Sequence, residues 1–361
     1  MKRLVDPNKL CMGCMAEISD NTKPCPKCGF LLSNYIQPSN SLPAMEILNG
    51  KYLVGKSIGM GGFGITYIGW DFYQSKRICI KEYFPQKLAS RGATTDVGRN
   101  ETSISKNNNY MGKSNSAVGN KAFTNSLSVF AYRTGAKKKA YADGLMAYIK
   151  EAENLSKFYF LPGIVSVRDF FLGNGTAYIV MEFIDGIDMK KMAGMNGGKL
   201  DNIFVFEVLK DVIKALGEVH KAGIIHRDIS PDNIMITDNN KGKFEAKLID
   251  FGAAKNHNGE RDNAILLKHG YAPIEQYDRN GNQGPWTDVY SMCATIYYCL
   301  SGIKIQKSYD RIAEDNVVSL SSLGIQVTEA QDEAIMKGLS VQIEDRYQTM
   351  DEMYQTLYGG D

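Results

Sequence analysis

The sequence lacks an excess of charge of either sign, and it lacks long hydrophobic runs. Its 361 residues include 42 Lys and Arg against 40 Asp and Glu, which leaves a formal net charge of +2. This balance gives no electrostatic reason to expect a nucleic-acid or membrane-surface partner. No apolar run approaches the roughly 18 residues of a membrane span, and the N-terminus meets charge and proline before any apolar stretch, unlike a secretory signal. We therefore expect a cytoplasmic protein.

Cysteine is also scarce, and its placement is uneven. Four of the seven cysteines form two Cys-x-x-Cys pairs: Cys11 and Cys14, then Cys25 and Cys28. In a chain with no secretory signal, clustered cysteines are more typical of metal ligands than of disulfides. Four thiolates suit zinc and leave no coordination position open, so the spacing predicts a structural zinc site. Two disulfides or a redox Cys-x-x-Cys pair are the alternatives, and the absence of a surrounding βαβ pattern disfavours them.

The cysteine segment resembles a zinc ribbon, which we place at residues 1–32. A module of this length holds no core without its metal, so folding and zinc binding are expected to be coupled. Gly13 and Gly29 fall where the ligand turns favour positive φ. Residues 33–47 are rich in Ser, Asn and Pro and are typical of a linker. The other cysteines lie in apolar runs, and we expect buried thiols there: Cys79, Cys293 and Cys299.

A glycine-rich loop follows the linker. Gly59, Gly61 and Gly64 form a GxGxxG pattern, which describes both a dinucleotide-binding turn and a hairpin that covers phosphates. The dinucleotide turn requires a helix directly after the glycines, whereas the residues that follow are β-branched and aromatic and predict a strand. We therefore expect the loop at the tip of a hairpin. The next apolar strand ends near Lys81.

Further motifs lie in the C-terminal half. Residues 209–220 have the apolar spacing of an amphipathic helix. After them comes His226-Arg227-Asp228, then Asn233 five residues beyond the aspartate, and then the run Asp250-Phe251-Gly252. A single motif of this kind is a weak signal. Their occurrence in this order, after the glycine loop, leaves chance a negligible explanation.

This order of motifs resembles the eukaryotic-like serine/threonine protein kinases of bacteria, over about residues 48–359. The resemblance implies an α+β fold of two lobes, a small β-rich N-lobe and a large α-helical C-lobe, preceded by the zinc ribbon. It implies ATP- and Mg²⁺-dependent transfer of the γ-phosphate to Ser or Thr hydroxyls of protein substrates. ATP is expected in the cleft between the lobes.

The resemblance also assigns roles to residues at matching positions. Asp228 is the expected catalytic base, and Asn233 and Asp250 hold Mg²⁺. Lys81 contacts the phosphates and pairs with Glu151, with Glu153 as the less favoured register. The loop glycines cover the phosphates. This chemistry needs positioning and charge neutralisation more than a covalent nucleophile. The remaining expected nucleotide contacts are Thr66, Cys79, Met181, Glu182, Ile184, Asp188 and Met235.

The sequence departs from the family pattern at Ser230. Serine/threonine kinases usually carry a lysine there, two residues after the catalytic aspartate, and it screens the γ-phosphate. Lys268 falls where the family usually has a threonine that contacts the catalytic loop. We hypothesise that Lys268 supplies the missing positive charge, the alternative being a solvated loop lysine. The family pattern also pairs Glu275 with Arg346.

Two further features concern regulation. Residues 250–275 contain no Ser or Thr, so we expect no switching by Ser/Thr phosphorylation of this segment. A polar insert at about residues 88–136 separates the strand of Lys81 from the helix of Glu151, which we expect from residue 137 onward. From this position we hypothesise that the insert controls whether Lys81 and Glu151 meet.

The sequence disfavours two other functions. A nucleotide-binding pseudokinase that acts as a scaffold through the zinc ribbon would lack one of the phosphoryl-transfer groups, and none is missing. Nucleic-acid binding by the ribbon would need clustered Lys and Arg with aromatic residues around the cysteines, which the sequence does not supply. We expect instead that the ribbon docks a protein partner or its own kinase domain.

Overall fold

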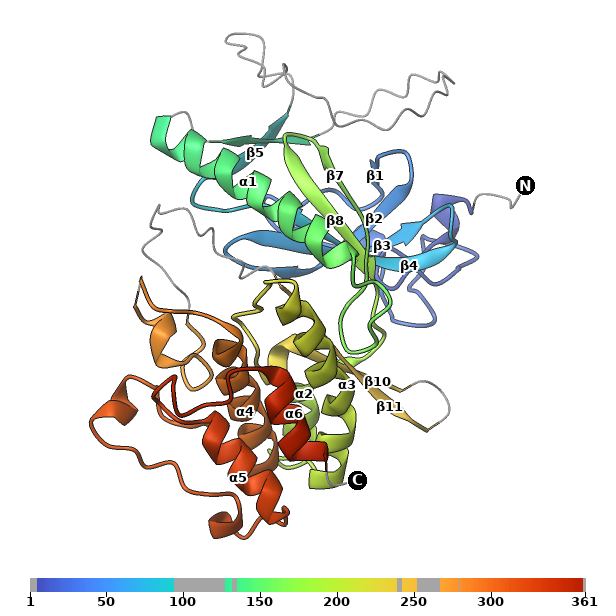
Figure 1. Cartoon of the computed structure of the whole chain (residues 1–361). Helices are drawn as coiled ribbons and strands as arrows, with labels where there is room; N and C mark the ends of the chain where they lie inside the picture. Colours follow the sequence, from blue (N-terminus) through green and yellow to red (C-terminus); the bar gives the residue numbers. More distant parts are fainter. Residues whose placement is uncertain are drawn as a thin grey trace. The chain divides into compact units, whose positions relative to one another are not determined.

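The computed structural model describes residues 5–93, 127–131, 135–238, 242–251, 267–278 and 280–359. The chain divides into two compact units (Figure 1). Unit 1 comprises Met1–Leu145 and Phe171–Tyr178, and unit 2 comprises Met146–Phe170 and Ile179–Asp361. Within the described ranges, no helix is both long enough and apolar enough to cross a membrane.

A six-stranded sheet has the order β1-β2-β3-β4-β8-β7; its first four strands belong to unit 1, and β7 and β8 each belong partly to unit 1 and partly to unit 2. Its central strands are antiparallel neighbours, as expected for a hairpin with the glycine loop at its tip. Buried aliphatic and tyrosine side chains line the sheet, because such residues pack well on a pleated surface. The strands are β1 (Ile47–Leu48), β2 (Tyr52–Met60), β3 (Gly64–Asp71), β4 (Lys76–Tyr83), β7 (Val167–Gly173) and β8 (Thr176–Glu182).

The described part of the insert contains a second sheet that the sequence pattern did not predict. Strands β5 (Ala89–Ala93) and β6 (Leu127–Ala131) pair in antiparallel register. Helix α1 (Gly135–Ser156) begins two residues before the expected start. Its first half packs on β4 through the rings of Tyr83 and Tyr141, whose centroids lie 5.4 Å apart. Residues 94–126 and 132–134 of the insert lie outside the described residues.

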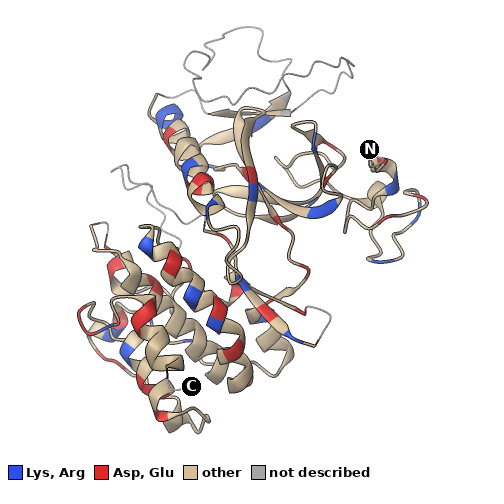
Figure 2. Cartoon of the chain, turned by 45° about the vertical axis from the view of Figure 1, so that its right-hand side comes forward, with Lys and Arg blue, Asp and Glu red and all other residues tan. Residues whose placement is uncertain are grey.

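Unit 2 is mainly helical, and the charged residues along its helices are of both signs (Figure 2). Helix α3 (Asn202–Lys221) contains the predicted amphipathic segment and starts after Asp201, whose side chain accepts from the Phe204 amide at 3.1 Å. Helix α4 (Pro285–Ser301) has proline in its first turn and ends at Gly302 with φ +74°, a pairing of start and stop signals that defines its length. Nearly every residue of α4 from Thr287 to Leu300 is buried.

The remaining elements of unit 2 surround these helices. A three-stranded sheet of order β11-β10-β9 lies next in sequence to the catalytic motifs. Helix α4 packs against α3, α5 and α6, which makes it the centre of the helical core. The elements are β9 (Ile187–Asp188), α2 (Met189–Met195), β10 (Ile234–Asp238), β11 (Phe244–Leu248), α5 (Glu329–Gly338) and α6 (Met350–Tyr358), with short 3₁₀ helices at Pro231–Asn233, Ile274–Gln276, Asp310–Ile312 and Ser321–Leu323. In unit 1, 3₁₀ turns occur at Pro7–Lys9 and Leu32–Asn34.

Candidate active site and metal centre

A buried carboxylate on α4 accepts hydrogen bonds from the backbone just before Asp228. Asp288 is fully buried and accepts from the amides of His226 at 2.7 Å and Arg227 at 2.8 Å, and its Oδ2 also lies 2.8 Å from Nε2 of His220. Burial raises the pKa of Asp288, but these hydrogen bonds and the nearby histidines outweigh it and hold the pKa below its ordinary value. The two amides also stabilise Arg227 in the left-handed region, at φ +68°.

Asp228 and Asn233 form one hydrogen-bonded group. The Asn233 side-chain amide donates to the Asp228 carbonyl at 2.7 Å and to its Oδ2 at 2.9 Å. The Asp228 amide donates to Nδ1 of His226 at 3.2 Å, which leaves the proton of the neutral ring on Nε2, 3.1 Å from the carbonyl of Ile249. Burial lowers the pKa of His226, which favours this neutral form.

Backbone pairing at the start of β10 brings the chain just before Asp250 next to Asn233. The Ile249 amide donates to the Asn233 carbonyl at 2.9 Å, and Ile234 is paired with Leu248 where β10 meets β11. Asp250 follows directly with φ +62°, and the ring of Phe251 lies edge-on to His226 at 4.5 Å. The Asn233 amide and the Asp228 carboxylate are therefore in contact at this end of the strand pair, and Asp250 lies two residues after β11. Amide and carboxylate oxygens are the ligands that Mg²⁺ prefers. Gly252 lies outside the described residues.

Lys268 reaches this group from the segment before Tyr271. Its Nζ lies 2.8 Å from Oγ of Ser230, 3.2 Å from Oδ2 of Asp228 and 3.1 Å from Oδ2 of Asp232. Burial raises the pKa of Asp228, and the charge of Lys268 opposes this in part. Lys268 is therefore a paired, partly exposed side chain, and its expected catalytic role stays a prediction.

Residues 250–275 form the activation segment, and its C-terminal end is held by the ion pair that the sequence predicted. Arg346 donates to the buried carboxylate of Glu275 at 2.8 Å, and Thr287 Oγ1 donates to the same carboxylate at 2.8 Å. Two serines bind the backbone just before Glu275. Ser291 donates to the carbonyl of Tyr271 and Ser308 donates to that of Ala272, both at 2.9 Å.

Two of the expected nucleotide contacts of unit 2 lie on neighbouring strands. Met235 of β10 is the register partner of Asp188 of β9. The amide of Glu182 donates to the Ser166 carbonyl at 3.0 Å, and Lys247 holds its carboxylate at 2.6 Å. Asp188 also caps α2 by accepting from the Lys191 amide at 2.8 Å. The two other expected contacts on this unit, Met181 and Ile184, flank Glu182.

In unit 1 the glycine loop forms the predicted hairpin tip. The Gly61 amide donates to the Gly64 carbonyl at 2.9 Å, and a Cβ added to Gly61 meets nothing within 4 Å. Thr66 is the register partner of both Gly59 and Lys81 across the sheet. Cys79, two residues before Lys81, is partly exposed rather than buried with the other apolar-run thiols. Lys81 belongs to unit 1 and Glu151 to unit 2, and their pairing stays a prediction.

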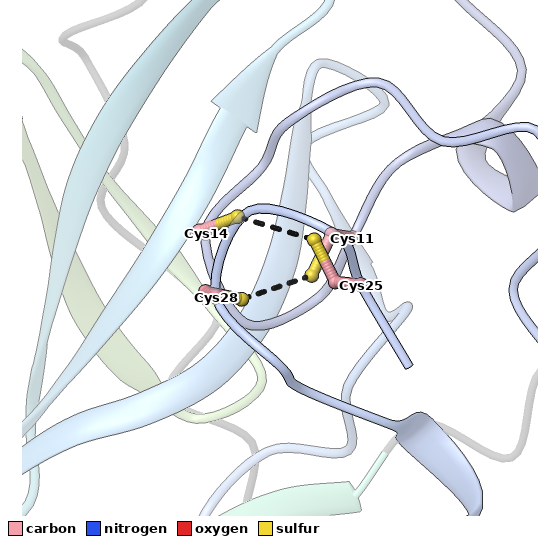
Figure 3. Close-up of side chains that lie close together, drawn as sticks. All are labelled: Cys11, Cys14, Cys25 and Cys28. Carbon is pink, nitrogen blue, oxygen red and sulfur yellow. Dashed lines mark hydrogen bonds between the residues drawn. The ribbon is translucent and has the colours of Figure 1, made fainter. Parts of the chain in front are cut away.

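The four clustered cysteines converge (Figure 3). Their sulfurs all lie within 4.8 Å of one another, with Cys11 3.6 Å from Cys28 and Cys14 3.8 Å from Cys25. A disulfide requires about 2.05 Å, so the sulfurs are not bonded to each other. A tetrahedral ion at about 2.3 Å from each sulfur separates them by about 3.8 Å, and the observed spacing fits a zinc ion.

The turns around the cysteines add hydrogen bonds to sulfur. The Gly13 amide lies 3.3 Å from the Cys11 sulfur. Although burial raises it, the amides of Cys28 and Lys27 hold the pKa of Cys25 at about 7, which favours a thiolate. Gly29 has φ +72°, as expected, but Gly13 does not have positive φ. Gly13 is needed for space instead, because a Cβ there would collide with the Phe30 side chain.

This cysteine module lies directly on β2. The Lys56 amide donates to the Met12 carbonyl at 2.8 Å, and the Ser57 amide donates to the Tyr35 hydroxyl at 3.0 Å. The β2–β3 register shifts between Val54 and Ser57, so the module occupies the point where β2 is irregular. A Cβ added to Gly55 would lie 2.6 Å from the Met12 carbonyl. The module therefore covers backbone groups of β2 that would otherwise be left at a sheet edge.

A buried ion-pair network in unit 1 was not found from the sequence. Glu82 is fully buried and accepts from Tyr67 at 2.8 Å, from Tyr178 at 3.0 Å and from Arg91 at 2.6 Å. The Tyr67 hydroxyl also accepts from the Leu42 amide, and Arg91 Nε donates to the Asn40 carbonyl. Part of the expected linker is thus packed on the sheet. The only sequence signal was a charged residue next to Lys81 in an apolar strand.

The fold and this group of side chains define a protein kinase, and comparisons with known proteins agree. The family model for the protein kinase domain matches residues 106–348. Serine/threonine-protein kinase F of Synechocystis is 29% identical over 321 residues, which are 87% of this chain and 56% of that protein. PknB of Mycolicibacterium smegmatis is 31% identical over 232 residues, 59% of this chain and 35% of that protein.

Solved structures give the same result. The structure named "PpkA-294 apo form" aligns with a TM-score of 0.69 at 32% identity, covering 88% of this chain and 100% of that chain. The kinase domain of Mycobacterium tuberculosis PknI has a TM-score of 0.57 at 18% identity and covers 89% of this chain, which supports the fold. The chain belongs to the protein kinase family. It spans about half or less of the length of the two curated relatives described above.

Proposed function

We propose that this chain transfers the γ-phosphate of ATP to Ser or Thr hydroxyls of protein substrates. The observation that carries the proposal is the group formed by Asp228, Asn233 and Asp250 on one end of the β10–β11 pair. The relatives named above are serine/threonine kinases and support the choice of acceptor. A pseudokinase is not favoured, because each of the phosphoryl-transfer residues is present.

The roles follow from the positions of these residues. Asp228 accepts a hydrogen bond from the substrate hydroxyl and orients it toward the phosphate, while the Asn233 amide keeps the carboxylate in place. Asn233 and Asp250 would hold Mg²⁺, which when bound neutralises charge on the phosphate oxygens. The Glu182 amide is already donating to Ser166, so we expect its carbonyl to contact adenine. The glycine loop offers bare backbone to the phosphates.

The test is phosphate transfer from γ-labelled ATP to generic protein substrates and to the chain itself. The wild type is compared with Asp228→Asn, followed by phosphoamino-acid analysis. Transfer to Ser or Thr that falls by about 10³-fold or more in the variant supports the proposal. Undetectable transfer by the wild type, or equal transfer by both proteins, contradicts it.

We also infer that the cysteine module binds zinc and docks on its own kinase domain. The sulfur spacing fits a tetrahedral ion. The hydrogen bonds from Lys56 to Met12 and from Ser57 to Tyr35 support docking on β2. A zinc ion here is structural, because four thiolates leave no position for a substrate. Because the clustered cysteines form no disulfide, we propose a reducing compartment, the cytoplasm.

A further inference from the structure

The roles proposed above do not account for the contacts of Lys268. Its ammonium faces a serine hydroxyl and two carboxylates within 3.2 Å, and one of those carboxylates belongs to Asp228. The lysine side chain is 29% exposed, so most of it is removed from water. Ser230 is fully buried beneath it. A partly buried cation that contacts the group that orients the substrate hydroxyl is placed to stabilise negative charge there.

The backbone around Lys268 gives the side chain a fixed starting point. Its carbonyl accepts from the amides of Tyr271 at 2.9 Å and Ala272 at 3.0 Å, which closes a turn. The carbonyls of those same two residues are held by Ser291 and Ser308. The side chain therefore extends from a backbone whose C-terminal side is held by hydrogen bonds.

The end of the activation segment does not need Lys268 as an anchor. The buried pair of Glu275 with Arg346 and the two serine hydrogen bonds already join it to the helical core. An ion pair between partly exposed groups contributes only about 0–1 kcal/mol to stability, so Lys268 would add little as an anchor. The arrangement has a clear use if a third anionic group, the phosphoryl group in transfer, comes beside Asp228.

We propose that Lys268 is a catalytic residue that stabilises the charge of the phosphoryl group during transfer, acting from the activation segment across to the catalytic loop. This inference rests on the proposed kinase function. Ser230, which holds the position where related kinases carry a lysine, orients the Lys268 ammonium through its 2.8 Å contact. In the transfer step, the bond between the γ-phosphorus and the bridging oxygen of ADP breaks as the bond to the substrate oxygen forms. The substrate proton leaves toward Asp228, and Lys268 contacts the non-bridging oxygens.

This placement has a regulatory consequence. The Lys268 ammonium belongs to the activation segment, and residues 250–275 contain no Ser or Thr to phosphorylate. Correct docking of the segment, fixed by Glu275 and Arg346, is then what makes the site competent. Treatment with a Ser/Thr phosphatase is expected to leave the rate unchanged.

The experiment compares Lys268→Met with the wild type in steady-state kinase assays. We expect kcat to fall by about 10²-fold or more, with the KM for ATP changed by less than about threefold, because the contact is made in the transition state. Lys304→Met is the matched control, since Lys304 lies over the Tyr271 ring at 5.8 Å and contacts the same segment without being placed at Asp228. The control is expected to keep kcat within about twofold of the wild type.

The second arm moves the charge back to the catalytic loop. The double variant Ser230→Lys/Lys268→Thr is expected to recover at least about tenfold of the kcat that Lys268→Met loses. A structural anchor at 268 predicts no recovery, because the double variant has no lysine there. Thermal unfolding of each variant identifies any that fails to fold. If the wild type transfers phosphate and Lys268→Met keeps its kcat, the inference is wrong while the kinase function stands. If the wild type is inactive, both fail.

Discussion

At the scale of single residues, Glu82 in unit 1 requires a compensating positive charge. It is a fully buried acid whose charge is balanced by one arginine from the insert strand β5. Removal of one partner from a buried pair leaves the other charge without compensation, and this costs more than the pair itself contributes. The pair therefore links three parts of unit 1 that are far apart in sequence: the linker, β4 and β5.

We predict that Arg91→Ala destabilises the protein by about 3–5 kcal/mol, because Glu82 then stays buried without its cation. The free energy of unfolding from urea titration measures this. Adding Glu82→Gln to Arg91→Ala removes the uncompensated charge and keeps one of the two oxygens that accept from Tyr67 and Tyr178. The double variant is expected to be more stable than Arg91→Ala alone, and the opposite order would show that the charge is not the cause.

Asp288 gives a pH-dependent prediction. Its folded-state pKa is depressed below the ordinary value of 3.8, so it stabilises the fold above that pH and loses the contribution as pH falls through the folded-state pKa. Asp288→Asn should therefore cost about 3 kcal/mol or more near pH 7. The difference from the wild type should shrink progressively below about pH 4. Urea unfolding of both proteins across this range tests it, and a difference that does not depend on pH argues against an ionised Asp288.

Residue-scale prediction from sequence worked where a motif determines a partner. The pairing of Glu275 with Arg346 is confirmed at 2.8 Å. It failed for Gly13, where the constraint is the Phe30 side chain and not backbone conformation. A neighbour that touches only in the folded state leaves no local signal in the sequence.

At the scale of elements, β2 uses backbone amides at its irregular point to bind the N-terminal segment that contains the cysteines. Its pairing with β3 is irregular between Val54 and Ser57, and there the amides of Lys56 and Ser57 bond to the cysteine module and the segment after it. The sequence predicted the strand, because its apolar residues and the glycine loop are local. It did not predict the contact, and the segment expected as a linker contains Leu42, which is buried.

Gly55 tests the close approach of these two elements. A Cβ at this position lies 2.6 Å from the Met12 carbonyl and collides with the Met15 side chain. We predict that Gly55→Ala destabilises unit 1 by about 1–3 kcal/mol, as over-packing does elsewhere. Gly194→Ala in α2 is the control, since its Cβ meets nothing within 4 Å. It is expected to stabilise by up to about 1 kcal/mol. Thermal unfolding compares the two, and equal shifts contradict the close approach.

At the scale of the whole molecule, the zinc site is expected to control the stability of unit 1. The module has few buried side chains of its own, and its backbone completes the hydrogen bonding of β2. Metal loss should therefore unfold the module and expose the Lys56 and Ser57 amides.

We predict that the full chain carries about one zinc ion and that a strong chelator lowers its melting temperature. Hydrogen exchange at the Lys56 and Ser57 amides should increase when the metal is removed. Cys28→Ser should abolish zinc binding, whereas Cys299→Ala, at a buried thiol of unit 2, should retain the metal. Metal content from a colorimetric assay decides the first point. Unchanged amide exchange after complete zinc loss would show that the module is not docked through these groups.

The sequence by itself determined what is local or ordered along the chain. The Cys-x-x-Cys pairs, the glycine hairpin, the order of Asp228, Asn233 and Asp250, and the unusual Ser230 are all readable because their chemistry requires fixed spacings. Tertiary structure alone decided which distant groups meet: Lys268 with Asp228, Arg91 with Glu82, and the cysteine module with β2. These contacts come from burial and chain closure over long separations, which no local pattern encodes.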